Sequence, residues 1–252
     1  MYTDTEGIIF KQVKTVNGRR MVLLFSKKYG KISAGTSISE KGRSKSALAM
    51  RPFTYGKYEL YKNRDSYNVN GADVIKSYYR IGEDVEKYMY CSFILEFTEK
   101  LIQEDAPAPE IFDMIIEFFD MMEKRTKKYS SLILAYQIKA LQLYGSMPQI
   151  DSCVLCGSKV DNSTFSVKDG GVICRKCELK IDVNKNDSLI YMINFGIVGI
   201  LKFFLENPLK SFENLALDDE VLKPIQRIIK SYISYHLDIS ELKSEGFLAG
   251  ES

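Results

Sequence analysis

Four cysteines carry the clearest chemistry in this sequence. Cys153 and Cys156 form one C-x2-C pair, and Cys174 and Cys177 form a second pair after a spacer of seventeen residues. Thiolates at this spacing are typical of a tetrahedral zinc site in which each pair supplies two ligands from one tight turn. Four protein ligands leave no position for water or substrate, so we expect a structural Zn²⁺ that holds a knuckle at residues 150–180.

The same cysteines have other interpretations. The site could have lost its metal or form two disulfides, which a reducing cytosol disfavours. A thioredoxin-like redox pair needs a βαβ pattern beside C-x2-C, and neither pair has one. The fifth cysteine, Cys91, falls in an apolar helical pattern, so we expect a buried small side chain there.

A net charge of +2 hides a strong asymmetry along the chain. Residues 1–80 contain sixteen Lys or Arg against six Asp or Glu, a balance of +10, so the remaining residues carry −8. A basic module joined to an acidic remainder predicts that the first part contacts a polyanion. The candidate nucleic-acid contacts are Arg19, Arg20, Lys27, Lys28, Lys41, Arg43, Lys45 and Arg51.

Aromatic side chains interleave with these cations. Tyr29, Phe53, Tyr55, Tyr58 and Tyr61 could stack bases on a small barrel without reading their sequence. The alternative is a solvated basic surface over core aromatics, because a tyrosine in a strand is more often packed than exposed for stacking. Charge and aromatic content leave both interpretations open.

Short β-rich runs must position these residues. They lie at 7–16, 19–27, 31–36, 55–62 and 68–81. Five short strands within about eighty residues fit a small closed barrel. Between the third and fourth runs lies a polar, basic loop, for which we expect a short helix at Ser46–Met50.

From Gly82 the apolar period changes to that of helices. Apolar stripes predict helices covering 90–101, 111–122, 133–144, 193–204 and 225–232. Pro224 suits the first turn of the last one. Such helices are too apolar on one face to stand alone and should pack as a bundle. We therefore predict an α+β chain, with a barrel domain at 1–80 and a helical domain at 81–252 into which the knuckle is inserted.

Catalytic chemistry has little support in the sequence. His236 is the only histidine and falls on the apolar face of the last helix, which favours a satisfied core or cap residue over a Ser-His-Asp set. Glu104, Asp105, Glu117 and Asp120 are spaced like a solvated helix surface. No phosphate-binding glycine motif occurs. We expect a protein that is not an enzyme, with an unrecognised carboxylate site as the alternative.

The sequence also bears on localisation. The N-terminus MYTDTEGIIFKQ lacks a basic run followed by an apolar core, so we expect no signal peptide. The most apolar stretch, 189–205, is too short and too interrupted by polar residues and glycines to span a bilayer. These features predict a cytoplasmic protein without a membrane segment.

The ordered motifs resemble one known family. They are TEGIIFKQV, YGKIS at Tyr29–Ser33, RPFTYGKYELYK at Arg51–Lys62, FSVKDGGVICRKC at Phe165–Cys177 and LKSEGFL at Leu242–Leu248. In this order, over nearly the whole chain, they resemble the bacterial RecO family of DNA repair and recombination mediators. No single motif decides this resemblance, since C-x2-C pairs are common.

The resemblance implies a fold and a set of partners. The barrel would be an OB-fold that binds single- and double-stranded DNA through the candidate cations and promotes annealing of complementary strands. The protein would bind the acidic-hydrophobic C-terminal tail of single-strand-binding protein and pair with RecR to load RecA, without a covalent step, in the nucleoid. The alternative is a zinc-ribbon protein associated with RNA or the ribosome, which would combine the same two features, a basic barrel and a four-thiolate zinc site.

Overall fold

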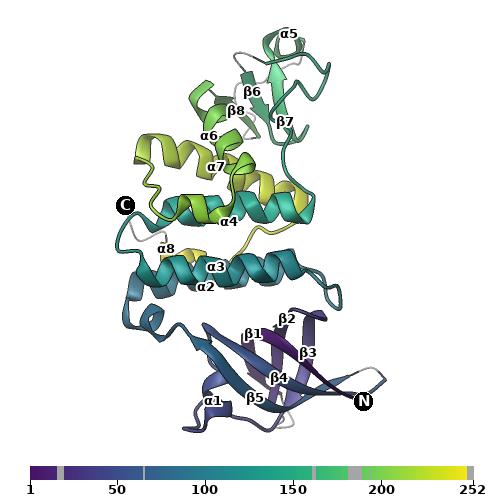
Figure 1. The fold of residues 1–252 in the computed structure, drawn as a ribbon. Coiled ribbons are helices and arrows are strands. Elements are labelled where there is room, and N and C mark those ends of the chain that lie inside the picture. Colours follow the sequence, from purple (N-terminus) through teal and green to yellow (C-terminus); the bar gives the residue numbers. More distant parts are fainter. Residues whose placement is uncertain (16–19, 65, 161–162, 181–188, 194, 249–252) are drawn as a thin grey trace. The chain divides into compact units, whose positions relative to one another are not determined.

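The computed structural model describes residues 1–15, 20–64, 66–160, 163–180, 189–193 and 195–248. Two compact units make up the chain. The first comprises Met1–Arg125 and Leu242–Ser252, and the second comprises Thr126–Glu241. Strands and helices of both units are shown in Figure 1, and the mixed α+β class predicted from the sequence is confirmed.

Five strands build the N-terminal part of the first unit. They are β1 (Tyr2–Lys14), β2 (Arg20–Ser26), β3 (Gly30–Thr36), β4 (Thr54–Lys62) and β5 (Tyr67–Ser77). Their hydrogen bonds run in the closed order β1-β2-β3-β5-β4, and β4 pairs with β1. Only the pairing of β3 with β5 is parallel. Alternate side chains such as Ile9, Leu24 and Ile32 fill the interior, as the period of two in a strand requires.

The predicted short helix in the basic loop is present as α1 (Lys45–Ala49). Ser44 caps it, because its hydroxyl accepts a hydrogen bond from the backbone N–H of Ala47 at 3.1 Å. Ala49 and Met50 are buried in the interior of the five-stranded sheet, and the Tyr58 hydroxyl donates to the Ala49 carbonyl at 2.6 Å. The apolar side of α1 is thus fixed, which leaves the polar side of the loop to solvent.

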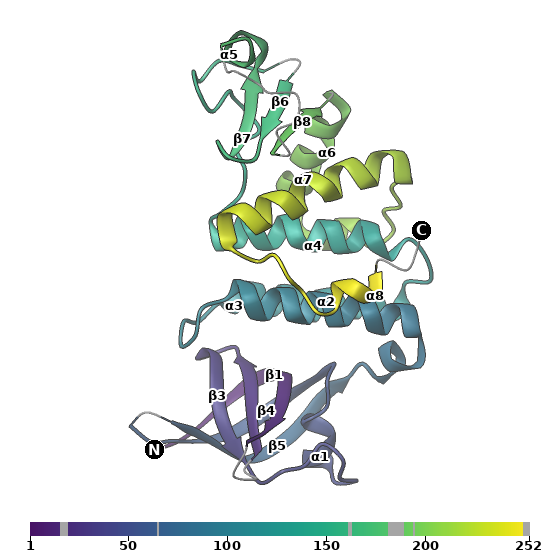
Figure 2. The same cartoon turned by 180° about the vertical axis from the view of Figure 1, so that it is seen from behind.

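Helices pack beside the strands in the same unit. They are η1 (Tyr79–Glu83), α2 (Val85–Leu101), α3 (Pro109–Lys124) and α8 (Glu245–Leu248). The ring of Phe25 on β2 meets Phe112 on α3 edge-on at 5.2 Å, and Lys76 on β5 pairs with Asp120 at 2.7 Å. Figure 2 shows α8 beside α2, far from it in sequence.

The second unit contains helices and a small sheet. They are α4 (Tyr129–Tyr144), β6 (Ser163–Ser166), β7 (Gly171–Cys174), α5 (Arg175–Glu178), β8 (Ile190–Ile193), α6 (Phe195–Glu206), η2 (Leu209–Phe212) and α7 (Asp219–Leu237). The strands follow the order β7-β6-β8. As predicted, α4 ends at Gly145, whose φ of 78° suits a residue without a side chain.

Two features of the second unit differ from the expectations. Pro224 lies inside α7, because that helix begins at Asp219 and not at the proline. The acidic Asp219 and Glu220 favour the earlier start through the helix dipole. Strand β8 was not predicted, since its four apolar residues read equally well as the start of a helix. The domain boundary at residue 80 stays a prediction, and the compact units divide the chain after Arg125.

Candidate metal centre and nucleic-acid interface

The four predicted cysteine ligands come together in the second unit. Their sulfur atoms all lie within 4.8 Å of one another. The Sγ atoms of Cys156 and Cys174 are 3.7 Å apart, and a tetrahedron with Zn–S bonds of ~2.3 Å has edges of about 3.8 Å. The four cysteines are therefore close enough to bind one metal ion.

Local backbone geometry explains how each pair converges. Cys153 and Cys156 flank a tight turn in which the Gly157 N–H donates to the Cys153 carbonyl at 2.8 Å, with φ at Gly157 of 73°. Cys174 ends β7, and Cys177 lies one turn further on, in α5. Hydrogen bonds with Ser158 lower the pKa of the Cys156 thiol to about 6, which favours the thiolate form that metals bind.

The apolar cluster around the cysteines is small. Ile173 is buried beside Cys153 and Cys174, and among the described residues Val154, Val160 and Cys177 pack around them. So small a cluster supplies little hydrophobic free energy. A bound ion would therefore contribute much of the local stability.

His236 is hydrogen-bonded within the fold, as predicted, but it is exposed and does not lie on the buried face of α7, which corrects the predicted placement. It lies in the last turn of α7, and its Nε2 atom is 2.6 Å from the Val167 carbonyl, which requires Nε2 to donate. This bond joins α7 to the turn between β6 and β7, so His236 supports the knuckle and is not a metal ligand.

The structure brings most of the predicted cations together around one loop. We call this set the basic loop: Lys41, Arg43, Lys45 and Arg51 of the segment between β3 and β4, together with Arg20 at the start of β2. Arg20 donates to the Ser37 carbonyl at 3.3 Å, and Arg51 donates to the Glu40 carbonyl at 3.1 Å. These two arginines hold the loop from both ends.

Three side chains of the basic loop project into solvent. Lys41, Arg43 and Lys45 are all exposed, and no ion pair among the described residues includes them. Their charges are not neutralised by neighbouring carboxylates. Such cations can displace counterions from phosphates, which is the main source of affinity for nucleic acid.

The remaining predicted cations lie elsewhere. Lys27 pairs with Asp113 on α3 at 2.7 Å, and this hydrogen bond raises the pKa of the Lys27 ammonium. Lys28 is exposed, with its Nζ atom 5.2 Å from the centre of the Tyr29 ring. Arg19 lies outside the described residues. The sequence set is thus divided between the basic loop and the β2–β3 turn.

Two of the five predicted stacking aromatics are core residues, and the other three are half-buried. Tyr58 is fully buried, Phe53 is 5% exposed, and the Tyr55 hydroxyl donates to the Glu6 carboxylate. Tyr61 is half-buried and packs on Tyr2, with the ring centres 5.0 Å apart. For Phe53 and Tyr58 the alternative of packed aromatics is therefore the correct one.

Tyr29 was named as a stacking candidate from the sequence, but the cluster that it forms with Tyr67 and Lys62 was missed. Tyr29 and Tyr67 lie with ring centres 5.7 Å apart, and Lys62 Nζ is 5.6 Å from one and 5.1 Å from the other. A hydrogen bond with Thr3 and the charges of Lys28 and Lys62 lower the pKa of Tyr29. Lys62 and Tyr67 pair at the end of the β4–β5 hairpin. Their short spacing in the sequence, on either side of a turn, was the signal that could have predicted this contact.

An exposed basic loop on a five-stranded sheet, together with helices and four cysteines close enough to bind a metal ion, is typical of a nucleic-acid-handling protein. The chain belongs to the RecO family. A family model described as "Recombination protein O N terminal" matches residues 1–78, and one described as "Recombination protein O C terminal" matches residues 82–246.

Curated relatives cover nearly the same length. The chain is 28% identical to the DNA repair protein RecO of Alkaliphilus metalliredigens, over 94% of this chain and 95% of the relative. It is 27% identical to that of Acetivibrio thermocellus, over 94% and 92%, and 25% identical to that of a Thermoanaerobacter species, over 97% and 96%. Family membership confirms the predicted role in DNA repair and recombination.

Among the helices of the described ranges, none combines the length and apolarity that crossing a bilayer requires.

Proposed function

We propose that the chain is a recombination mediator that binds single- and double-stranded DNA and anneals complementary strands. The observation that carries the proposal is the solvent-facing trio Lys41, Arg43 and Lys45 on the basic loop. Two DNA strands repel each other through their phosphates, and a cationic surface between them lowers this repulsion. The role is binding and strand handling, with no covalent step.

The five-stranded sheet is an OB-fold in this proposal. Its closed strand order and the helix between β3 and β4 support that assignment. Annealing must accept any complementary pair, so the surface has to bind DNA without reading its sequence. Exposed cations on a flexible side-chain stem meet this requirement, since contacts to phosphates carry no sequence information.

The metal in this proposal is a structural Zn²⁺ bound by Cys153, Cys156, Cys174 and Cys177. Four cysteine sulfurs within 4.8 Å of one another support a soft, four-coordinate ion. When bound, the ion supplies a cross-link between the turn at Cys153–Cys156 and the β7–α5 segment. It takes no part in DNA chemistry.

Partner proteins follow from the family resemblance. We propose that the chain contacts the acidic-hydrophobic C-terminal tail of single-strand-binding protein, pairs with RecR and helps to load RecA in the nucleoid. Among these partners, the acidic tail has the charge that a basic protein surface attracts.

One annealing experiment tests the proposal. Complementary strands are coated with single-strand-binding protein, with or without its C-terminal tail, and double-strand formation is followed after the chain is added. We expect acceleration that depends on the tail. No acceleration with uncoated or coated strands would refute the proposal, and preferential binding of structured RNA in competition would favour an RNA-associated protein.

A further inference from the structure

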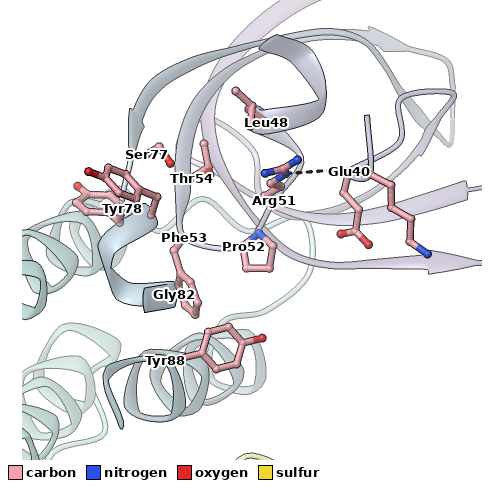
Figure 3. A pocket seen from close by; sticks show the side chains of 12 residues that line it. Glu40, Leu48, Arg51, Pro52, Phe53, Thr54, Ser77, Tyr78, Gly82 and Tyr88 are labelled. Atoms are coloured by element: carbon pink, nitrogen blue, oxygen red, sulfur yellow. Dashed lines mark hydrogen bonds between the residues drawn. The ribbon is translucent and has the colours of Figure 1, made fainter. Parts of the chain in front are cut away.

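A hollow of about 510 Å³ lies in the first unit beside the basic loop. Its volume falls in the range of roughly 300–1,000 Å³ that is typical of small-ligand sites. Figure 3 shows the side chains around it. The lining residues that the argument uses are Glu40, Lys41, Leu48, Arg51, Tyr79 and Tyr88.

Aromatic rings form one side of this hollow. Tyr88 is 47% exposed and Tyr79 is 61% exposed, so both rings present surface to solvent. Behind them Phe53 is buried, and its ring meets Tyr88 edge-on at 5.4 Å. The Phe53 backbone has a φ of 55°, in the left-handed region. Phe53 thus packs against Tyr88 within the lining of the hollow.

Cations form the opposite rim. Arg51 is held by two hydrogen bonds, to the Glu40 carbonyl at 3.1 Å and to the Gly42 carbonyl at 3.3 Å. Its orientation is therefore fixed before any ligand arrives, and a guanidinium has five donors in total. Lys41 also lines the hollow. The one carboxylate among the described lining residues is Glu40, and carboxylates accept hydrogen bonds from the amino groups of bases.

We propose that this hollow takes one unpaired base of single-stranded DNA. The base stacks on Tyr88 and Tyr79, while Lys41 and Arg51 contact the phosphates on either side of it. This inference rests on the proposed function and adds a site that discriminates between strands. Bases of a duplex are paired and stacked on their neighbours, so they cannot enter without first being flipped out.

Charge outside the hollow favours a nucleic acid over a peptide. Arg43 and Lys45 extend the exposed cations beyond the rim, on the same loop as Lys41. A strand with one charge per nucleotide can use such a row, whereas an acidic peptide with an apolar end would need only the nearest cation. The occupant is therefore a strand, and a peptide is an outcome that the experiment must separate.

Binding of a strand with one central 2-aminopurine tests the site. Tyr88→Ala and the more exposed Tyr79→Ala are compared with wild type by fluorescence and by affinity. We expect each to weaken single-strand binding by about tenfold and to remove the fluorescence change on binding, because base–aromatic stacking is lost. Affinity for a duplex of equal length should not change, and Tyr88→Phe should keep the wild-type values.

Matched controls separate the outcomes. Tyr235→Ala removes a similarly exposed tyrosine from α7 of the second unit and should leave single-strand binding unchanged. If wild type binds no DNA, the proposed function itself fails. If wild type binds but both alanine variants match it, or lose duplex binding equally, only the hollow is refuted. Saturable binding of an acidic, apolar-ended peptide that Tyr88→Ala abolishes, with single-strand binding intact, would likewise overturn it.

Discussion

At the scale of single residues, the lysines of the first unit differ in what surrounds them. Lys11, Lys27 and Lys76 each pair with a carboxylate on α2 or α3. Lys41 and Lys45 face solvent instead. A surface ion pair stabilises a protein by only about 0–1 kcal/mol, but it cancels the charge that a phosphate would meet. DNA affinity should therefore depend on the unpaired cations of the basic loop.

Single substitutions can test this division. We expect Lys27→Ala to change DNA affinity by less than about twofold, because Asp113 already neutralises it. Lys41→Ala should weaken binding several-fold, by about 1 kcal/mol, because a phosphate contact and its released counterion are lost. Fluorescence anisotropy at fixed salt measures both. Equal losses of affinity for the two variants would contradict the distinction between paired and solvent-facing lysines.

Glu96 on α2 is a second residue with a defined local effect. Its carboxylate accepts hydrogen bonds from the backbone N–H groups of Lys243 and Ser244, at 2.9 and 2.8 Å, and from the Ser244 hydroxyl. Burial raises the pKa of Glu96, but these hydrogen bonds outweigh that effect and hold the pKa below its ordinary range. The charged form therefore attaches the C-terminal segment.

This attachment predicts a dependence on pH. A lowered pKa in the folded state gives stability that is present above the ordinary glutamate pKa of about 4.3 and is lost as the pH falls through the folded value. We expect Glu96→Gln to be less stable than wild type at pH 7, with the difference closing in acid. Unfolding free energies from pH 7 to pH 3 measure this, with the exposed Glu241→Gln as control. A constant difference would contradict the account.

At the scale of elements, the proposed role of the four cysteines is to link two segments through a bound ion. The ion would join the turn after α4 to β7 and α5, where the apolar cluster around the cysteines is small. The candidate DNA contacts lie about a hundred residues earlier in the chain. The cysteines have the most specific spacing in the sequence. Even so, we expect the loss of one cysteine to reduce folding stability more than DNA affinity.

Cys174→Ser separates these effects. We expect loss of the bound ion, which should be one per chain in wild type, and unfolding of the second unit at lower temperature, because a structural ion contributes folding free energy. DNA affinity should change less than stability. Metal content, thermal unfolding and anisotropy measure the three quantities, with Cys91→Ala as the control. A mutant that stays fully folded without metal and loses only DNA binding would contradict the structural role proposed for the metal site.

At the scale of the whole molecule, local patterns predicted much of what the structure contains. The alternation in residues 7–62 and the helical stripes after Gly82 were sufficient for the mixed class and for most helices. The C-x2-C pairs were sufficient for the cysteine cluster, because two ligands on one turn converge whatever the surrounding fold. Each of these signals lies within a short stretch of sequence.

The rest depended on contacts between distant parts of the chain. Lys27 was predicted to bind phosphate, but its partner Asp113 is 86 residues away and no local pattern shows the pair. Tyr58 faces inward because of where β4 pairs with β1, which strand composition alone does not fix. The hollow beside Tyr88 needs the basic loop and the start of α2 in one place, so it too was invisible before the fold was known.

The salt dependence of single-strand binding tests the central claim, that DNA is bound through the basic loop. The variant Lys41→Glu/Arg43→Glu/Lys45→Glu is compared with wild type and with Lys210→Glu/Lys223→Glu/Arg227→Glu, which makes the same charge change on η2 and α7. If the three loop cations each contact a phosphate, the slope of log affinity against log salt should fall by about two in the loop variant, at roughly 0.7 per contact. The control variant should keep the wild-type slope. An unchanged slope in the loop variant, or an equal fall in both, would contradict the account.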